Sequence, residues 1–351
     1  MATKVLDDLD NQLLNEVQWQ FPLTRYPYNE LAARLNISPA EVIKRLGAAK
    51  EAGVLRQLSA IFDTRALGYK SSLIAARVDP DKIDEAAERL NAHPGISHNY
   101  KRNHEFNLWY TLAVPPGSSF DDHVRVVHRL SEARSTRVLP TLKLFKIGVK
   151  LDMTGKRKAT EKAEVEENEK PDIWIHSPGP VLSEQEKAAI RVLQEDLPLV
   201  EEPFDLEAET LGTTGEELVA TAQDFIKQKL MRRFAAVMNH RSAGFKANAM
   251  AVWCVPEDRI DEVGYRMASF ASVSHCYRRP TYDDWPYSIF TMLHGRRASD
   301  IEAAVQAISE DTGIAEHALL WSVKEYKKVR VRYFTPDWDE WESYYLAPPT
   351  K

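Results

Sequence analysis

The chain has 351 residues, of which 44% are hydrophobic and 28% are charged, and its formal net charge is -6. This composition is typical of ordinary soluble domains, and an acidic chain lacks the basic footprint of a general nucleic-acid binder. Its two cysteines, Cys254 and Cys276, exclude a disulfide framework and a cysteine zinc site. The first residues, MATKVLDDLDNQ, lack the apolar core of a signal peptide, and no apolar run is long enough to cross a bilayer. We therefore expect a cytoplasmic protein.

A long internal repeat runs through the sequence. Residues 27–78, which begin PYNELAARLNIS, return as residues 203–254, which begin PFDLEAETLGTT, without an insertion. In this alignment Gly68 matches Gly244. A repeat of this length indicates two copies of one domain, paired as a dimer within a single chain.

Each copy is predicted to begin with a winged helix-turn-helix. In the first copy, leucines at helical spacing predict one helix, LAARLN predicts a second, and a third is expected to begin at Pro39. Ser38 and Glu41 have the spacing of a capping box around that start. The following VLRQLSAIFDTRALGY is a candidate β-wing. We place these domains at residues 1–67 and 181–243.

A second module follows each helix-turn-helix. In the first copy, the apolar patterns predict the order β-α-β-β-α-β. The six segments, in that order, are SSLIAARV, DKIDEAAERLNAH, ISHNYKRN, FNLWYTLAVP, FDDHVRVVHRLSEA and TRVLPTLKLFKIGVKL. This is the order of a ferredoxin-like fold, expected at residues 68–153 and 244–334. The predicted fold class is α+β, a tandem repeat in which the two ferredoxin-like units join their sheets and present pockets along a shared surface.

Two further segments complete the predicted organisation. Residues 154–180 are rich in Lys, Glu and Pro and are predicted to be a linker. The tail, 335–351, combines acidic and aromatic residues, and we expect it either to be disordered or to fold back on a basic surface.

One chemical pattern, His-x-Tyr-x-Arg, occurs in both copies. Its members are His98, Tyr100 and Arg102 in the first copy and His275, Tyr277 and Arg279 in the second. Since successive strand side chains point to opposite faces, each triad is expected to share one face. A lone His-Tyr pair on a sheet is more often packed and hydrogen-bonded than functional, but its recurrence favours a site. His104 extends the first row without a histidine counterpart, and His294 is likewise unmatched.

These motifs resemble those of a known family. LAARLNIS and VIKRLGAAKEAGVLRQ resemble the helix-turn-helix of Lrp/AsnC transcriptional regulators. A closer resemblance is to the siroheme decarboxylases, which are related to the Lrp/AsnC proteins, and it is carried by SHNYKRNHEFNLWYTL and SHCYRRPTYDDWPYSIFTMLHG. Siroheme decarboxylases usually consist of two related subunits, and this chain resembles both subunits fused head to tail. The resemblance implies a carboxy-lyase that removes CO2 from two acetate side chains of siroheme. The product would be 12,18-didecarboxysiroheme, a precursor of heme d1 or of heme made by an alternative route. Fusion of the two subunits in one chain favours heme d1 synthesis.

The resemblance also implies roles for individual residues. It makes His98, His104 and His275 the candidate catalytic residues, because histidine transfers protons near neutral pH. His98 or His275 is also a candidate axial ligand of the substrate's iron. Cations that bind carboxylates and aromatic residues that line the macrocycle are expected to hold the substrate, together with one further histidine. These substrate-binding candidates are Tyr100, Lys101, Arg102, Trp109, Tyr277, Arg278, Arg279, Trp285 and His294.

Other interpretations stay open at this point. Most surface cations only keep a face solvated, and a large aromatic residue on a strand more often belongs to the core. A rival hypothesis is a DNA-binding regulator that senses a tetrapyrrole or an amino acid. Its second recognition helix, TGEELVATAQDFIKQK, is acidic and would repel phosphate. A heme sensor or carrier without turnover is the third candidate.

The expected partners are siroheme and related iron tetrapyrroles, together with other proteins of heme d1 biosynthesis, and neither DNA nor a membrane. No cofactor is expected, since the iron tetrapyrrole is the substrate. The sequence does not decide which half acts on which acetate, the order of the two reactions, the division of roles among the histidines, or whether two chains associate further.

Overall fold

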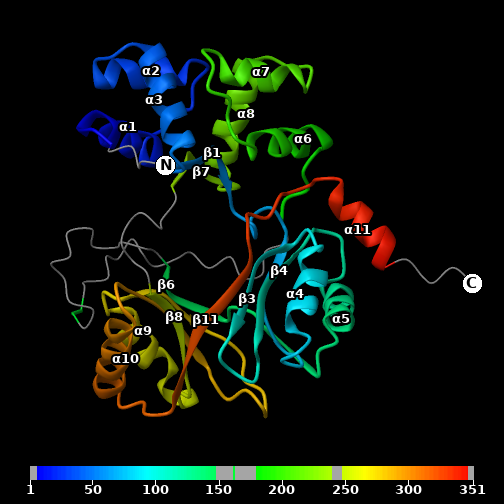
Figure 1. Cartoon of the computed structure of the whole chain (residues 1–351). Coiled ribbons are helices and arrows are strands. Elements are labelled where there is room, and N and C mark those ends of the chain that lie inside the picture. The colour runs from blue at the N-terminus through cyan, green and yellow to red at the C-terminus, as the bar shows by residue number, and fades with distance from the viewer. Residues whose placement is uncertain (1–5, 148–160, 163–178, 239–246, 347–351) are drawn as a thin grey trace, which may run out of the picture. The chain divides into compact units, whose positions relative to one another are not determined.

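The computed structural model describes residues 6–147, 161–162, 179–238 and 247–346 (Figure 1). These residues form two compact units. One unit combines the helix-turn-helix segments of both copies, and the other combines both ferredoxin-like segments. Most of the predicted linker, 154–180, lies outside the described residues. None of the described helices has the length and apolar character that a membrane span requires.

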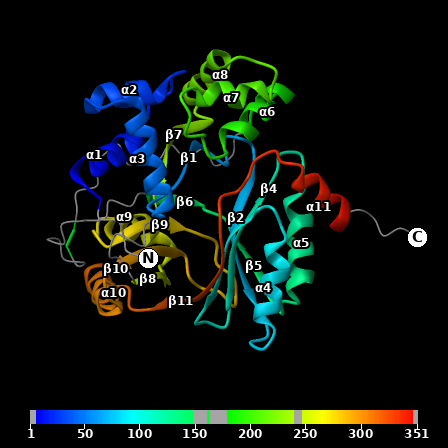
Figure 2. The ribbon, with the colours of Figure 1, turned by 45° about the horizontal axis from the view of Figure 1, so that its top comes forward.

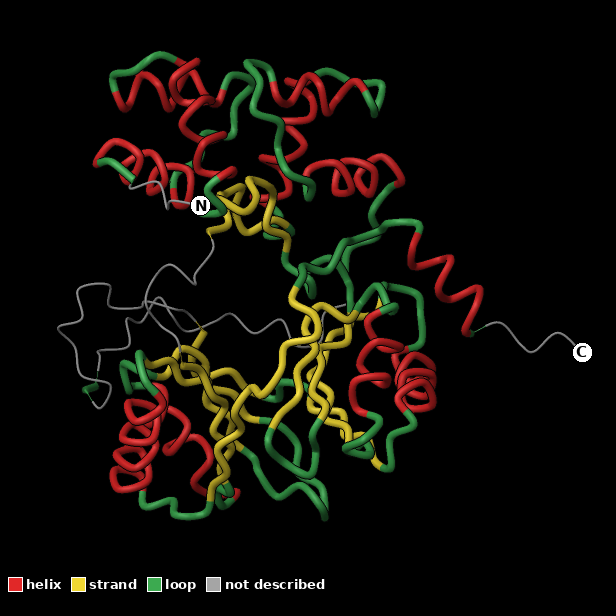
Figure 3. Tube along the Cα trace, in the orientation of Figure 1, coloured by secondary structure: helices red, strands yellow, loops and turns green. Residues whose placement is uncertain are grey.

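The helix-turn-helix unit is built from matching elements of the two copies. The first copy supplies α1 (Asp8–Trp19), α2 (Pro27–Leu35), α3 (Pro39–Glu51) and β1 (Leu55–Phe62). The second copy supplies α6 (Glu184–Leu193), α7 (Pro203–Glu209), α8 (Gly215–Lys227) and β7 (Met231–Met238). β1 and β7 pair antiparallel, so the segments predicted as wings join the two copies to each other (Figure 3).

Side-chain caps fix where the third helix of each copy begins. Ser38 accepts a hydrogen bond from the backbone nitrogen of Glu41 at 3.2 Å, as predicted. The Glu41 carboxylate accepts from Arg45 instead of reaching back to Ser38, so only half of the predicted capping box forms. In the second copy, Thr214 and Glu217 form the complete box.

The second unit is a nine-stranded sheet with helices. Its first-copy elements are β2 (Lys70–Arg77), α4 (Ile83–Asn91), β3 (Ile96–Arg102), β4 (Leu108–Val114), α5 (Phe120–Ser131), β5 (Ser135–Leu139) and β6 (Lys143–Ile147). Its second-copy elements are β8 (Ala247–Trp253), η3 (Glu257–Arg259), α9 (Ile260–Ala268), β9 (Val273–Arg278), β10 (Ile289–Gly295), α10 (Ala298–Thr312) and β11 (His317–Lys328). The predicted β-α-β-β-α-β order is confirmed in both copies.

The last strand of each copy crosses to the other copy. The strand order is β5-β2-β4-β3-β11-β8-β10-β9-β6. The first part of β11, His317–Trp321, pairs with β8, and its later residues, Ser322–Lys328, pair with β3 of the first copy. In the same way β5 pairs with β2, whereas β6 pairs with β9 of the second copy. Pro140 interrupts the segment predicted as one closing strand, because proline cannot donate to a strand ladder.

This exchange leaves each half-sheet with an outer and an inner face. α4 and α5 cover the outer face of the first-copy strands, and α9 and α10 cover that of the second-copy strands (Figures 1 and 2). A separate hydrophobic cluster lies on the inner faces and draws residues from both copies, among them Ala75, Trp109, Met250 and Phe290. The inner faces are therefore in contact within one unit and form a shared core.

The acidic and aromatic tail forms a helix, α11 (Asp337–Tyr345). Trp341 packs on two buried histidines, with ring centroids 4.1 Å from His93 and 4.9 Å from His123. His123 Nε2 lies 3.2 Å from the Glu342 carboxylate. Burial lowers the pKa of both imidazoles, so both are neutral at physiological pH. The tail thus folds back, as one of the two expectations held, but its anchor is a neutral histidine pair instead of a basic surface.

Gly264 in α9 provides a test of the strand exchange, because the Phe145 ring of β6 fills the space beside it. A methyl group at Gly264 would lie 2.4 Å from that ring, which is 2% exposed. We expect Gly264→Ala to lower the free energy of unfolding by about 1–3 kcal/mol in urea denaturation. Gly47→Ala is the matched control, since the nearest atom to its methyl lies at 3.9 Å and the helix should gain about 1 kcal/mol. Equal effects at both positions would contradict the packing of β6 on α9.

Candidate functional site

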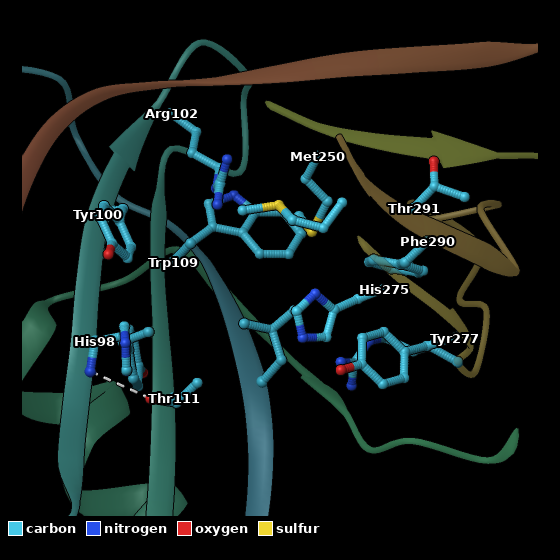
Figure 4. A pocket seen from close by; sticks show the side chains of 14 residues that line it. His98, Tyr100, Arg102, Trp109, Thr111, Met250, His275, Tyr277, Phe290 and Thr291 are labelled. Carbon is cyan, nitrogen blue, oxygen red and sulfur yellow. Dashed lines mark hydrogen bonds between the residues drawn. The ribbon is translucent and has the colours of Figure 1, made fainter. Parts of the chain in front are cut away.

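A cavity of about 210 Å³ lies between the inner faces of the two half-sheets. Both His-x-Tyr-x-Arg triads line it: His98, Tyr100, Arg102, His275, Tyr277 and Arg279. Figure 4 shows His98, Tyr100 and Arg102 on one side of the cavity and His275 and Tyr277 on the other. Trp109, Met250 and Phe290 line the same cavity. The expectation that each triad shares one strand face agrees with this placement. Separate pockets were expected along the shared surface, whereas here one cavity receives both triads.

A β-bulge immediately precedes the histidine in each copy. In β3, Ile96 pairs with Leu112 and Asn99 with Tyr110, so two residues lie opposite Thr111. In β9, Val273 pairs with Leu293 and His275 with Met292, which leaves Ser274 as the extra residue. Bulges bend a strand and redirect its side chains, and they are common beside active sites. The bulge therefore sets how each histidine enters the cavity.

A serine in each bulge holds the histidine that follows it. Ser97 Oγ lies 3.0 Å from His98 Nδ1, and Ser274 Oγ lies 2.9 Å from His275 Nδ1. The serine contact therefore helps to orient each imidazole ring. Sequence reasoning missed these serines, although the dipeptide Ser-His precedes the motif in both copies.

The wall of the second copy carries a histidine whose pKa is lowered by burial. Burial, with smaller contributions from His294 and Lys146, lowers the pKa of His275 to about 4. His275 is therefore neutral at physiological pH. His294 does not line the cavity, but it lies close enough to His275 to contribute to that shift.

Arg102 is a buried guanidinium in this cavity. It is 7% exposed, and its Nη1 donates to the carbonyl of Leu320 at 2.8 Å. Its Nε is buried without a hydrogen-bond partner among the described residues. Burial lowers its pKa to about 10, so it stays charged at neutral pH, and no carboxylate of the described chain raises that pKa.

Arg279 occupies the matching position on the other wall. Its guanidinium carbon lies 5.0 Å from the ring centroid of Tyr277 and 5.4 Å from that of Phe290, and it donates to the carbonyl of Leu139. Arg102 lies over Tyr100 in the same way, at 5.7 Å. Stacking on an aromatic ring restricts the orientation of the guanidinium plane. Each wall thus carries a cation whose guanidinium group lies over an aromatic ring.

Two predicted carboxylate clamps lie outside the cavity. Lys101 and Arg278 alternate with the triads, so their side chains belong to the opposite, helix-covered faces. Lys101 lies near Asp84 of α4 and contributes to the lowered pKa of that carboxyl group. Arg278 pairs with Glu257 at 2.5 Å. Strand alternation separates these two cations from the cavity, and their role in substrate binding stays a prediction.

Trp285 and His104 also lie behind the cavity wall. Trp285 is fully buried and packs against Trp109, with ring centroids 5.2 Å apart. The half-buried His104 has its ring centroid 5.4 Å from that of Trp285, and its Nδ1 accepts from the backbone nitrogen of Phe106 at 3.1 Å. Trp285 therefore supports the wall instead of lining it. The catalytic role predicted for His104 stays a prediction.

Comparison with known proteins agrees with this architecture. The model of an AsnC-like ligand binding domain matches residues 66–146 and 242–327, and that of a siroheme decarboxylase NirDL-like HTH domain matches residues 10–56 and 186–232. A siroheme decarboxylase of Hydrogenobacter thermophilus is 40% identical over 332 residues, covering 94% of this chain and 96% of that protein. A siroheme decarboxylase beta subunit of Methanosarcina barkeri is 43% identical over 143 residues, covering 41% of this chain and 94% of its own length.

Solved structures give the same result. A crystal structure of the siroheme decarboxylase NirDL in co-complex with an iron-uroporphyrin III analogue has a TM-score of 0.77 and 35% identity. The match covers 97% of this chain and 99% of that one. With the fold, the repeat and the near full-length similarity in agreement, this chain belongs to the siroheme decarboxylase family.

Proposed function

We propose that this protein is a siroheme decarboxylase that removes CO2 from two acetate side chains of siroheme, giving 12,18-didecarboxysiroheme. The observation that carries the proposal is the single cavity in which both copies present a histidine, a tyrosine and a stacked arginine. This combination fits a flat, apolar ring with carboxylates at its edge, because aromatic walls receive the ring and arginines bind the carboxylates. The cocrystallised relative binds an iron-uroporphyrin III analogue, which has this chemistry.

The reaction requires a carboxylate to leave and a proton to arrive. The bond between the acetate methylene and its carboxyl carbon breaks, and CO2 departs without the bonding electrons. The macrocycle takes up that electron density, and a proton added to the methylene carbon completes a methyl group. No further cofactor is part of this proposal.

Residues that line the cavity would orient the ring, exclude water and transfer the proton. Arg102 and Arg279 hold carboxylates that do not react, which orients the ring. Trp109, Met250 and Phe290 exclude water and so favour loss of the charged carboxylate. His98 and His275 lie within the same cavity and are the groups that hold or transfer protons, or that approach the iron.

A DNA-binding regulator is not favoured. In α3, Arg45 pairs with Asp7, Asp10 and Glu41, and Lys50 pairs with Asp196 at 2.8 Å. The first turn of α8 carries Glu216 and Glu217. Cations that are already neutralised contribute little to phosphate binding, and an acidic helix opposes it. We infer that the helix-turn-helix segments serve to join the two copies through β1 and β7.

The pathway, the partner proteins and the cellular location of the reaction are part of the proposal and follow from the family resemblance. We infer that the product serves heme d1 synthesis or an alternative route to heme, that other proteins of that pathway are partners, and that the protein acts in the cytoplasm. The beta subunit of Methanosarcina barkeri covers 41% of this chain, in line with each copy standing for one separate subunit.

Mass spectrometry of the tetrapyrrole after anaerobic incubation with siroheme tests the proposed reaction. We expect stepwise loss of two CO2 units with the intact protein. His98→Ala and His275→Ala should slow this loss by about 100-fold or more, the usual contribution of a positioned proton-transfer group. His104→Ala tests whether a histidine outside the cavity also contributes.

The exposed His128 of α5 provides the control, and His128→Ala should retain full activity. Siroheme that stays intact while its bound spectrum changes would replace the decarboxylase with a carrier or sensor. Full activity in both cavity-histidine variants would remove them from the mechanism.

Arg102→Met separates ligand binding from stability. A buried charge without a carboxylate partner destabilises the folded protein, so its replacement by an apolar side chain should leave stability unchanged or raise it. Affinity for iron-uroporphyrin III should fall about 10-fold to 100-fold, because a charge-assisted hydrogen bond to a carboxylate is lost. Absorption titration and urea denaturation measure the two effects.

Lys101→Met is the matched control, since that side chain lies on the opposite face of β3. It should leave the affinity for iron-uroporphyrin III unchanged. A loss of affinity in Lys101→Met equal to that in Arg102→Met would contradict the assignment of Arg102 as the carboxylate clamp.

A further inference from the structure

The two copies are related by an approximate twofold axis within the sheet unit. β6 of the first copy pairs with β9 of the second, and the later residues of β11 pair in return with β3 of the first copy. Reciprocal contacts of this kind indicate a twofold relation between two copies. A cavity that lies beside such an axis belongs to one copy and is repeated in the other, whereas a cavity on the axis is shared. The two cases predict different numbers of bound ligands.

Strand pairing shows which lining residues are equivalent. Tyr100 pairs with Trp109 across β3 and β4, and Tyr277 pairs with Phe290 across β9 and β10. The two tyrosines occupy the same place in the repeated triads. Trp109 and Phe290 are therefore equivalent positions of the two copies, although their side chains differ.

The same pairing extends the match to β2 and β8. Leu73 pairs with Thr111 of β4, and Met250 pairs with Met292 of β10. Thr111 and Met292 each lie two residues beyond the aromatic residue that pairs with the triad tyrosine, so they are equivalent. Leu73 is therefore equivalent to Met250. In the ungapped alignment of the repeat Leu73 matches Ala249 instead, so strand pairing moves this match by one residue.

All 14 residues that line the cavity belong to such pairs. Six of them are the two triads. The other pairs are Leu73 with Met250, Trp109 with Phe290, Tyr110 with Thr291 and Thr111 with Met292. Since each pair contributes one residue from each copy, exchange of the two copies maps the lining onto itself. The cavity therefore lies on the approximate twofold axis.

The cavity has room for one tetrapyrrole at most. Its volume of about 210 Å³ is smaller than the roughly 300–1,000 Å³ that is usual for sites of drug-sized ligands. A molecule bound on the axis meets equivalent residues at its two sides. One ligand therefore contacts both triads, and two ligands cannot occupy the cavity together.

The substrate of the proposed reaction has a matching arrangement. Positions 12 and 18 of the macrocycle lie on neighbouring rings, at equal distances from the methine bridge that joins these rings. A twofold axis in the plane of the macrocycle and through that bridge exchanges the two positions and also exchanges the two faces of the ring. The two acetates that react are thus related in the same way as the two triads.

We propose that the cavity binds one tetrapyrrole on the approximate twofold axis of the chain, so that each triad faces one of the two reacting acetates. The methine bridge between the two reacting rings lies on the axis, and the triads approach the macrocycle from opposite faces. One bound molecule undergoes both reactions in a single orientation. The binding of one ligand on the axis follows from the lining of the cavity, whereas the identity of the groups at its two sides rests on the proposed function.

Absorption titration of the intact protein with iron-uroporphyrin III measures how many molecules one chain binds, and we expect one. Arg102→Met and its equivalent Arg279→Met should each weaken this single site by about 10-fold or more, because both triads contact the same molecule. Lys101→Met, on the opposite face of β3, is the matched control and should keep the stoichiometry and the affinity. Two molecules per chain, or an unchanged affinity in either arginine variant, would overturn the proposal.

The acetate that remains after partial reaction tests the assignment of one acetate to each triad. In the time that the unaltered protein needs for both reactions with siroheme, His98→Ala and His275→Ala should each release one CO2. Nuclear magnetic resonance of the extracted, demetallated tetrapyrroles should show that the two products retain different acetates. The same product from both variants, or release of none or two CO2 units by either, would overturn the assignment. Siroheme left intact by the unaltered protein, together with one iron-uroporphyrin III bound per chain, would refute the proposed function alone.

Discussion

The backbone hydrogen bonds of β11 are the interaction on which the rest of the sheet unit depends. This 12-residue strand pairs first with β8 of its own copy and then with β3 of the other. β5 and β6 make the reciprocal exchange. The inner faces of the two half-sheets are held together by backbone ladders as well as by side chains. The cavity walls therefore cannot separate without breaking strand pairing, and both triads stay directed into one space.

Fusion of the two copies in one chain permits walls that differ. In a symmetric homodimer, any change at one wall is repeated at the other. Here the position opposite the histidine is Thr111 in one copy and Met292 in the other, and His104 has no histidine counterpart. Asp284, which falls nearest to the place of His104, forms two hydrogen bonds of 2.8 Å with Arg137 of the first copy. At this position of the repeat, His104 of the first copy thus packs beside Trp285, whereas Asp284 of the second copy forms an ion pair with the first copy.

The sequence predicted those features that follow from local periodicity. The order of helices and strands, the pseudo-dimer and the common face of each triad all follow from spacing, and the same alternation argues against Lys101 and Arg278 as clamps. Strand exchange was not predictable, because it depends on which edge strand β6 and β11 meet in three dimensions. The bulges at Ser97 and Ser274 were missed for the same reason: an extra residue in a ladder is visible only once the partner strand is known. Burial of Trp285 behind Trp109 likewise depends on contact between the copies.

The distribution of charge distinguishes the two units more sharply than their composition does. In the helix-turn-helix unit, the cations of α3 are neutralised by nearby carboxylates, as the contacts of Arg45 show. In the cavity, Arg102 is buried and has no such partner among the described residues. Keeping a guanidinium in this state costs free energy of folding, which only an anionic ligand would recover. A net charge of -6 therefore does not oppose the proposed binding of a polycarboxylate, because affinity depends on where an uncompensated charge lies and not on the sum over all residues.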